Sequence, residues 1–176
     1  MSPAVAARLR VAVIVVVTAF VQSTFGADLR IAGVAPDLLT LVVIAAGLVG
    51  GPEQGTVVGF GAGLLADLLV TTTPFGLSAL TLCLIGFSVG SLRSAVLHDS
   101  LLLTPVVALV STAATVALFV GLADLVGQAQ VAAEGQAWLV RVALVEGVYA
   151  AVLSIPVTRI MRRAAAGSAG AARLAA

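Results

Sequence analysis

The sequence predicts an all-α membrane protein, a polytopic bundle of about six transmembrane helices with both termini in the cytoplasm. Three observations lead to this fold class. First, 61% of the 176 residues are hydrophobic and only 10% are charged, whereas about 25% of a typical soluble domain is charged. Second, the mean hydropathy is +1.20, and apolar stretches near the length of a spanning helix recur along the chain. Third, the arginines lie almost entirely on one side of these stretches. The expected solvent is therefore the bilayer.

The apolar stretches define the expected elements in order. A spanning helix needs about 20 predominantly apolar residues. Arg8 and Arg10 open the first stretch as in a signal peptide, but further spans follow it instead of a soluble domain, so we expect a retained helix. The six expected spans of a single domain over residues 1–163 are 9–26, 36–50, 54–71, 75–92, 101–123 and 137–159. The Ala- and Gly-rich tail, 164–176, is expected to be disordered.

Short turns join the second, third and fourth spans. GGPE at 50–53 contains a proline that cannot continue a helix. TTTPFG at 71–76 contains Pro74, which can begin the next helix. Because elements joined by short connections are neighbours in space, residues 36–92 are expected to form one consecutive up-down-up unit.

The placement of arginine predicts the orientation. With the N-terminus inside, the cytoplasmic segments hold Arg8, Arg10, Arg93, Arg159, Arg162, Arg163 and Arg173. The outer loops hold Arg30 alone. An excess of basic residues marks the cytoplasmic side, so both termini are expected there. The cluster of Arg159, Arg162 and Arg163 is expected to contact anionic lipid or a partner, with the ordinary topology signal as the plainer interpretation.

Glycine recurs at intervals of four in the third span. Gly55, Gly59 and Gly63, followed by Asp67, lie along one slowly drifting face of a helix. Small residues on one face let a second backbone come close. The matching stripe expected on the fourth span consists of Ser78, Gly86 and Gly90.

Asp67 is an acid among leucines. A charge facing lipid costs roughly 2.5–3.5 kcal/mol near a helix centre, so the carboxylate is expected to face the protein interior. Asp67 and Arg141 both lie ~6 Å below the outer end of their spans at 1.5 Å rise per residue, which predicts an ion pair, direct or through water. The alternatives are hydrogen bonds to backbone or hydroxyl groups, and a role in ligand or proton traffic. Glu146, nearer the midplane, is expected to share Arg141 or to carry a proton.

Pro36 and Asp37 open the second span at its outer end. A carboxylate there suits the positive end of a helix dipole, and a simple helix start is the plainer interpretation. Because Asp37, Asp67 and Arg141 all lie toward the outer side, we expect them to line a polar pocket. Such a pocket would be a ligand site or a docking surface for a partner's helix.

The sequence contains no catalytic motif. His98 is the only histidine and no other metal ligands cluster beside it. Cys83 is the only cysteine, which excludes a disulfide within the chain. No phosphate-binding loop or dinucleotide fingerprint is present. We expect a protein without enzymatic activity, metal, other cofactor or nucleic-acid partner.

Several short motifs follow one another between residues 34 and 92. They are PDLL at 36–39, GP at 51–52, GFGAGLLADL at 59–68, FGLSAL at 75–80 and the glycine pair at 86 and 90. In this order and spacing they resemble the MreD family of rod shape-determining proteins. The length and the six-span layout fit the family over the whole chain, whereas the last two spans match in hydropathy alone.

The resemblance implies a non-enzymatic scaffold of the cell-elongation machinery in the bacterial cytoplasmic membrane, which acts in lateral peptidoglycan synthesis and cell shape. It implies binding to the bitopic protein MreC and, through it, to actin-like MreB, the glycan polymerase RodA and a penicillin-binding transpeptidase. The family's fold is thought to be similar to the substrate-binding subunits of energy-coupling-factor transporters. A subunit of a small-molecule transporter is therefore the alternative, although aromatic residues make up only 5% of the chain, which is few for a ligand pocket.

Overall fold

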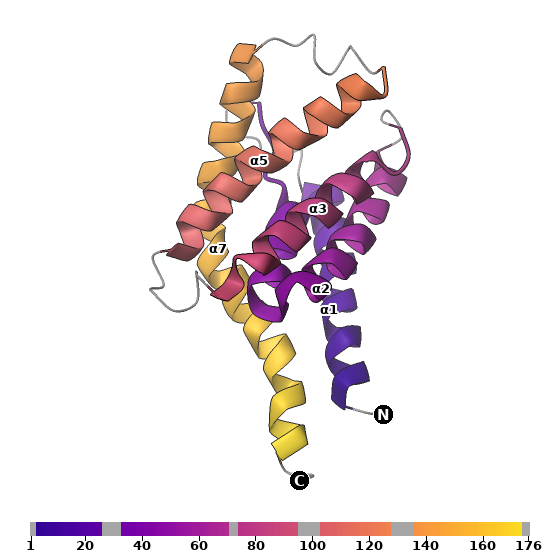
Figure 1. The fold of residues 1–176 in the computed structure, drawn as a ribbon, viewed down its shortest axis with the longest axis vertical. Coiled ribbons are helices and arrows are strands. Elements are labelled where there is room, and N and C mark those ends of the chain that lie inside the picture. The colour runs from indigo at the N-terminus through magenta and orange to yellow at the C-terminus, as the bar shows by residue number, and fades with distance from the viewer. Residues whose placement is uncertain (1–2, 26–32, 71–73, 95–102, 128–135, 174–176) are drawn as a thin grey trace.

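The computed structural model describes residues 3–25, 33–70, 74–94, 103–127 and 136–173. This part of the chain folds into helices α1 (Pro3–Phe25), α2 (Leu38–Leu69), α3 (Leu77–Ser91), α5 (Leu103–Leu125) and α7 (Gln136–Arg173), as Figure 1 shows. All except α3, which is shorter, are long and apolar enough to cross a membrane. The architecture is that of an all-α membrane protein.

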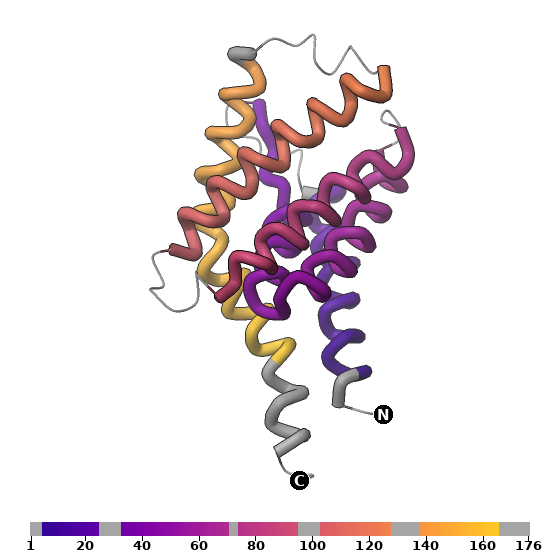
Figure 2. The backbone as a smooth tube through the Cα atoms, viewed as in Figure 1, coloured from indigo at the N-terminus to yellow at the C-terminus, as the bar shows by residue number. Residues whose placement is uncertain are grey.

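Helix α2 consists of two arms that meet at Gly51. The backbone of Gly51 is not helical, with φ 84° and ψ −172°, a region that glycine enters without steric cost. A Cβ atom on Gly55 would lie 3.0 Å from the Cα of Gly47, although residues eight apart in a straight helix are about 12 Å apart. The second arm, 52–69, therefore folds back along the first, 38–50, as the tube in Figure 2 shows. The sequence predicts a turn over 50–53, and in the structure the chain reverses at the single non-helical residue Gly51.

The first arm of α2 forms the centre of the bundle. Every residue from 39 to 48 is buried. The residues that share buried clusters with this arm come from every other helix, and they include Val15 of α1, Leu82 and Ile85 of α3, Ala108 of α5, and Ala150 and Met161 of α7. A helix that is apolar all round is one that is buried on all sides. In lipid, such an arm is stabilised by close van der Waals packing, because lipid tails are as apolar as its neighbours.

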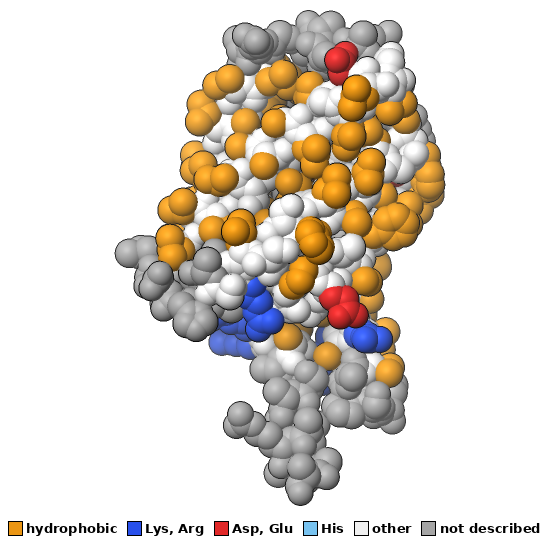
Figure 3. All heavy atoms as spheres, in the orientation of Figure 1, with side chains coloured by type: hydrophobic (Ala, Val, Ile, Leu, Met, Phe, Trp, Pro, Cys, Tyr) orange, Lys and Arg blue, Asp and Glu red, His pale blue; other side chains and the backbone are white. Residues whose placement is uncertain are grey.

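The outer helices present apolar side chains on the bundle's surface. Phe20 of α1 is 72% exposed and Val152 of α7 is 69% exposed. Figure 3 shows hydrophobic side chains spread over the flank of the molecule, with arginines gathered toward the end where the chain begins and finishes. This distribution is expected of a surface that contacts lipid along its length and water at its ends.

Helix α7 is longer than the sequence predicts. It continues to Arg173, whereas the tail from residue 164 was expected to be disordered. Alanine has the highest helix propensity of any residue, and 164–173 is rich in it, so the helix continues beyond its apolar part, Trp138–Ala165. Its 38 residues span about 57 Å, well beyond the ~30 Å hydrocarbon core.

Candidate functional site

Glycines bring the second arm of α2 and helix α3 into backbone contact. A Cβ atom on Gly55 would lie 2.2 Å from the carbonyl oxygen of Gly86, and one on Gly59 would lie 2.2 Å from the carbonyl oxygen of Leu82. Real Cβ atoms do not approach other atoms within 3.0 Å. No side chain fits at these positions unless a backbone moves.

The same contact continues at both ends of the helix pair. At one end, a Cβ atom on Gly63 would lie 2.5 Å from the carbonyl oxygen of Ser78. At the other end, one on Gly90 would lie 2.5 Å from the Cα of Pro52, beside the reversal of α2. We call this backbone contact the glycine seam: Gly55, Gly59 and Gly63 meet α3 at Gly86, Leu82 and Ser78, and Gly90 meets Pro52. It is the close backbone approach that the four-residue spacing predicts.

Asp67 lies one turn beyond the glycine seam and caps α3. Its Oδ2 atom accepts hydrogen bonds from the backbone N–H groups of Gly76 at 2.8 Å and Ala79 at 3.3 Å, and Oδ1 accepts one from Ser78 at 3.1 Å. The first N–H groups of a helix have no partner within the helix, and they favour a negative charge. Gly76, the residue before α3, has φ 98° and no side chain to act as a cap. Asp67 supplies that cap from the neighbouring helix.

The predicted pairing of Asp67 with Arg141 is replaced in the structure by these backbone hydrogen bonds. Asp67 is only 4% exposed and faces α3, whereas Arg141 lies on the exposed surface of α7. Equal depth along the bundle does not place two side chains on facing surfaces. The arrangement observed is the alternative in which the carboxylate bonds to backbone groups.

A second carboxylate caps the first arm of α2. Asp37, which follows the buried Pro36, accepts hydrogen bonds from the backbone N–H of Thr40 at 3.1 Å and from the Thr40 hydroxyl. Gln22 of α1 donates its amide N–H to Asp37 at 3.4 Å, and its carbonyl oxygen accepts the N–H of Leu39 at 3.0 Å. Asp37 and Gln22 together satisfy the start of the arm, as an N-cap does. The sequence analysis does not identify Gln22 as a site residue. The one signal of its role in the sequence is that it is an amide inside an apolar span.

Replacing Gln22 with leucine is expected to loosen α1 from α2. The change leaves the N–H of Leu39 without its acceptor, which costs about 1–3 kcal/mol for a buried donor. Thermal unfolding in detergent measures the loss. The control is Ser23→Ala, since among the described residues the Ser23 hydroxyl bonds to Ala19 of its own helix. Equal stability of the two variants would show that Gln22 does not anchor α1.

Residues of five helices line a half-open pocket of about 270 Å³ beside the Asp37 cap, which we call the polar cavity. Its polar lining residues are Gln22, Asp37, Thr40, Ser78, Thr81, Thr115 and Glu146, and its aromatic ones are Phe119 and Trp138. The sequence predicts a pocket lined by Asp37, Asp67 and Arg141. Of these, only Asp37 lines the polar cavity, and Glu146 provides the second charge.

Helix geometry explains why Glu146 lines the polar cavity and Arg141 does not. Trp138, Val142 and Glu146 all line it, and their spacing of four puts them on one face of α7. Arg141 lies about 100° around the helix from Val142. This four-residue spacing is a signal that the sequence contains and that reasoning from depth overlooked.

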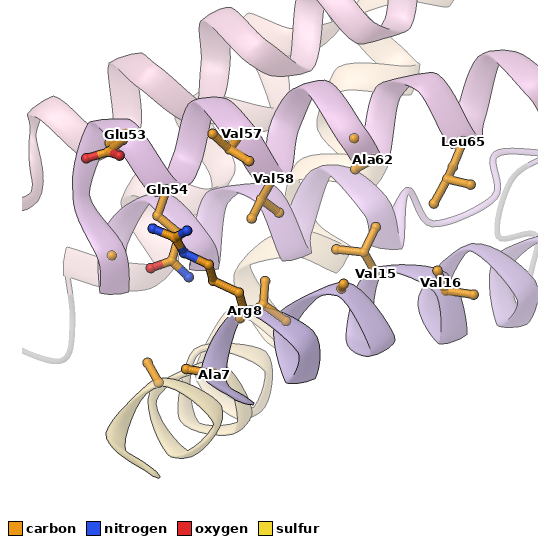
Figure 4. A pocket seen from close by; sticks show the side chains of 15 residues that line it. Ala7, Arg8, Val15, Val16, Glu53, Gln54, Val57, Val58, Ala62 and Leu65 are labelled. Atoms are coloured by element: carbon orange, nitrogen blue, oxygen red, sulfur yellow. The ribbon is translucent and has the colours of Figure 1, made fainter. Parts of the chain in front are cut away.

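A larger hollow of about 630 Å³, the α1–α2 groove, lies between α1 and the second arm of α2. Figure 4 shows Val15, Val16 and Val57 along it, and Arg8 and Glu53 toward one end. Most of its other lining residues are apolar or small, and they include Ala12, Val58, Gly61, Ala62 and Leu65.

Gly61 in this groove differs from the glycines of the seam. A Cβ atom there would meet no atom within 4 Å. Glycine inside a helix costs about 1 kcal/mol relative to alanine, and no contact within the described chain requires it at this position.

The remaining predicted residues lie at the ends of the bundle. Arg159, Arg162 and Arg163 are exposed on α7, toward its C-terminal end, and that end of α7 lies at the same end of the bundle as the start of α1 (Figure 1). His98 lies outside the described residues. Within the described residues, no group of three or more His, Cys, Asp or Glu side chains is placed to hold a metal ion.

Comparison with known proteins identifies the family. The model of the family described as rod shape-determining protein MreD matches residues 6–164. No curated protein and no solved structure gives a significant match to the chain. The match includes α1 from Ala6, all of α2, α3 and α5, and α7 as far as Ala164, and so contains the glycine seam and both carboxylate caps. The chain therefore belongs to the MreD family of cell-shape membrane proteins.

Proposed function

We propose that the chain is a non-enzymatic scaffold of the bacterial cell-elongation complex, which binds MreC in the cytoplasmic membrane and thereby supports lateral peptidoglycan synthesis. The observation that carries this proposal is the family match over residues 6–164. Through MreC, the scaffold would be linked to MreB, RodA and a penicillin-binding transpeptidase. The glycine seam and the two caps suit this role, because they hold the helices in one fixed arrangement that a partner can recognise.

The proposed topology has six crossings with both termini in the cytoplasm. Four crossings are α1, α3, α5 and α7, and the two arms of α2 provide the others. The first arm, 38–50, is only about 20 Å long, but it is surrounded by protein, so it need not match the bilayer thickness. An even number of crossings agrees with the placement of both chain ends at one end of the bundle (Figure 1). The arginines at that end favour the cytoplasmic side.

The α1–α2 groove is the proposed seat of the single transmembrane helix of MreC. A bitopic partner must approach sideways through lipid, and the groove lies on the flank, between α1 and the second arm of α2. Gly61 and its small neighbours in the lining allow a close helix contact. Arg8 and Glu53 at one end of the groove offer charges to the segment where the partner's helix leaves the membrane.

Photo-crosslinking in native membranes tests this seat. A crosslinking amino acid at Val57, which is 67% exposed in the groove, is expected to capture MreC. The matched control site is Val152, which is as exposed but lies on α7 outside the groove. Gly61→Phe is expected to reduce MreC recovery at least fivefold. Gly121→Phe, at a glycine with equally open surroundings on α5, is expected to leave recovery unchanged.

Two results would contradict the proposal at different levels. Capture of MreC from Val152 and not from Val57 would place the partner on another helix and overturn the groove assignment. Recovery of an ATPase pair and a coupling subunit in place of MreC would overturn the scaffold itself and establish the transporter alternative.

A further inference from the structure

We propose that the polar cavity binds a small organic ammonium cation. This inference goes beyond the scaffold function and does not depend on it, since the cavity and the α1–α2 groove share no lining residue. The cavity is assembled from α1, α2, α3, α5 and α7 together.

The charge of the polar cavity favours a cation. Asp37 and Glu146 enter it from different helices, and none of its lining residues is Arg, Lys or His. Asp37 also offsets the positive end of the first α2 arm, which would otherwise repel a cation. When both carboxylates are ionised, their mutual repulsion across the pocket costs free energy. A bound cation removes that cost.

Glu146 is the group that remains available to a ligand. Asp37 already accepts hydrogen bonds from Thr40 and Gln22, whereas Glu146 takes part in no hydrogen bond or ion pair among the described residues. No fully buried side-chain oxygen or nitrogen in the described chain lacks a partner. The carboxylate of Glu146 therefore retains accessible surface, and that surface opens into the cavity it lines.

The remaining walls favour an organic cation over a hard metal ion. Ca²⁺ and Mg²⁺ take six or more oxygen ligands, but Trp138, Phe119 and aliphatic side chains form much of this lining. Aromatic rings attract an ammonium group placed over their faces. A volume of about 270 Å³ lies just below the range of about 300–1,000 Å³ of ordinary ligand pockets. The expected ligand is therefore an ammonium with a few small substituents.

Trp138 provides a direct test, because it is the only tryptophan in the chain and it lines the polar cavity. Tetramethylammonium chloride is titrated into the purified full chain in lipid nanodiscs, with sodium chloride holding the ionic strength constant. The expected result is a saturable change in tryptophan emission that sodium chloride alone does not produce. Magnesium chloride is titrated in parallel, and a saturable response to it without one to tetramethylammonium would overturn the assignment.

Variants connect the signal to the carboxylate. Glu146→Gln is expected to weaken tetramethylammonium binding at least tenfold, and Phe119→Leu at least threefold. The control is Asp124→Asn, an exposed acid on α5 that does not line the cavity, and its affinity is expected to match the wild type. Removing an intramembrane charge does not impede insertion, and thermal unfolding of each variant checks the fold. Wild-type affinity in folded Glu146→Gln and Phe119→Leu, or an absent response in the wild type, would refute the site.

Discussion

Replacing Gly59 with leucine is expected to lower the amount of folded protein in the membrane at least tenfold. A Cβ atom alone would lie 2.2 Å from the carbonyl oxygen of Leu82 and 3.0 Å from the nitrogen of Cys83. Overpacking a core that can rearrange its side chains costs about 1–3 kcal/mol. Here the obstacle is a backbone that cannot change rotamer, so α2 and α3 must separate along the glycine seam.

The matched control for Gly59→Leu is Gly61→Leu, two residues further along the same helix. Both changes add the same side chain and remove the same helix penalty of glycine, but only Gly59 faces α3. Membrane levels and thermal unfolding are measured for both variants in cells that lack MreC, because Gly61 lines the proposed MreC seat. If Gly59→Leu accumulated and unfolded like Gly61→Leu, the close packing of the seam would be disproved.

Replacing Asp67 with leucine is expected to destabilise the protein by on the order of 3 kcal/mol or more. Three N–H groups at the start of α3 lose their acceptor, and one unsatisfied buried donor already costs about 1–3 kcal/mol. Asp67→Asn is expected to lose less, because its amide oxygen still accepts a hydrogen bond although the charge that favours the helix dipole is gone. Unfolding by heat or by graded denaturing detergent measures these stabilities. The expected order is wild type most stable, then Asp67→Asn, then Asp67→Leu.

Arg141 distinguishes the cap from an ion pair. If Asp67 acts as the cap of α3, Arg141→Leu is expected to be clearly less destabilising than Asp67→Leu. If the two side chains formed the pair that the sequence predicts, either change would leave an unpaired charge and the losses would be similar. Two similar single losses, with a double variant that loses clearly less stability than their sum, would support the pair and contradict the cap.

Much of the fold was predictable because it depends on local patterns. Composition alone indicates that the bilayer is the solvent. Any bundle that spans a membrane must present apolar side chains to lipid, however its helices are arranged. The packed face of α2 was predictable because Gly55, Gly59 and Gly63 are four residues apart. In a helix with 3.6 residues per turn, this spacing places them on the same side. The break at Gly51-Pro52 was predictable as an interruption, because proline cannot continue a helix.

The site was less predictable, because it depends on how helices are rotated about their axes. Depth along the membrane suggested that Asp67 meets Arg141, but depth contains no information about rotation. The role of Gln22 becomes recognisable only when α1 is seen beside the start of α2, and the position of Glu146 at the polar cavity only when α7 is seen there. The pairing of Asp67 with α3 depends on Gly76, a residue that provides no cap of its own.

The amino-acid sequence therefore establishes the membrane class, the glycine face and the MreD motifs, all of which are properties of single segments. The polar cavity, the caps donated between helices and the α1–α2 groove arise only when five helices pack together. The physical reason is that helical periodicity relates residues three or four positions apart, whereas the packing of the other helices against the central α2 arm sets how each helix is rotated about its axis. That rotation places Glu146 in the cavity and leaves Arg141 on the surface.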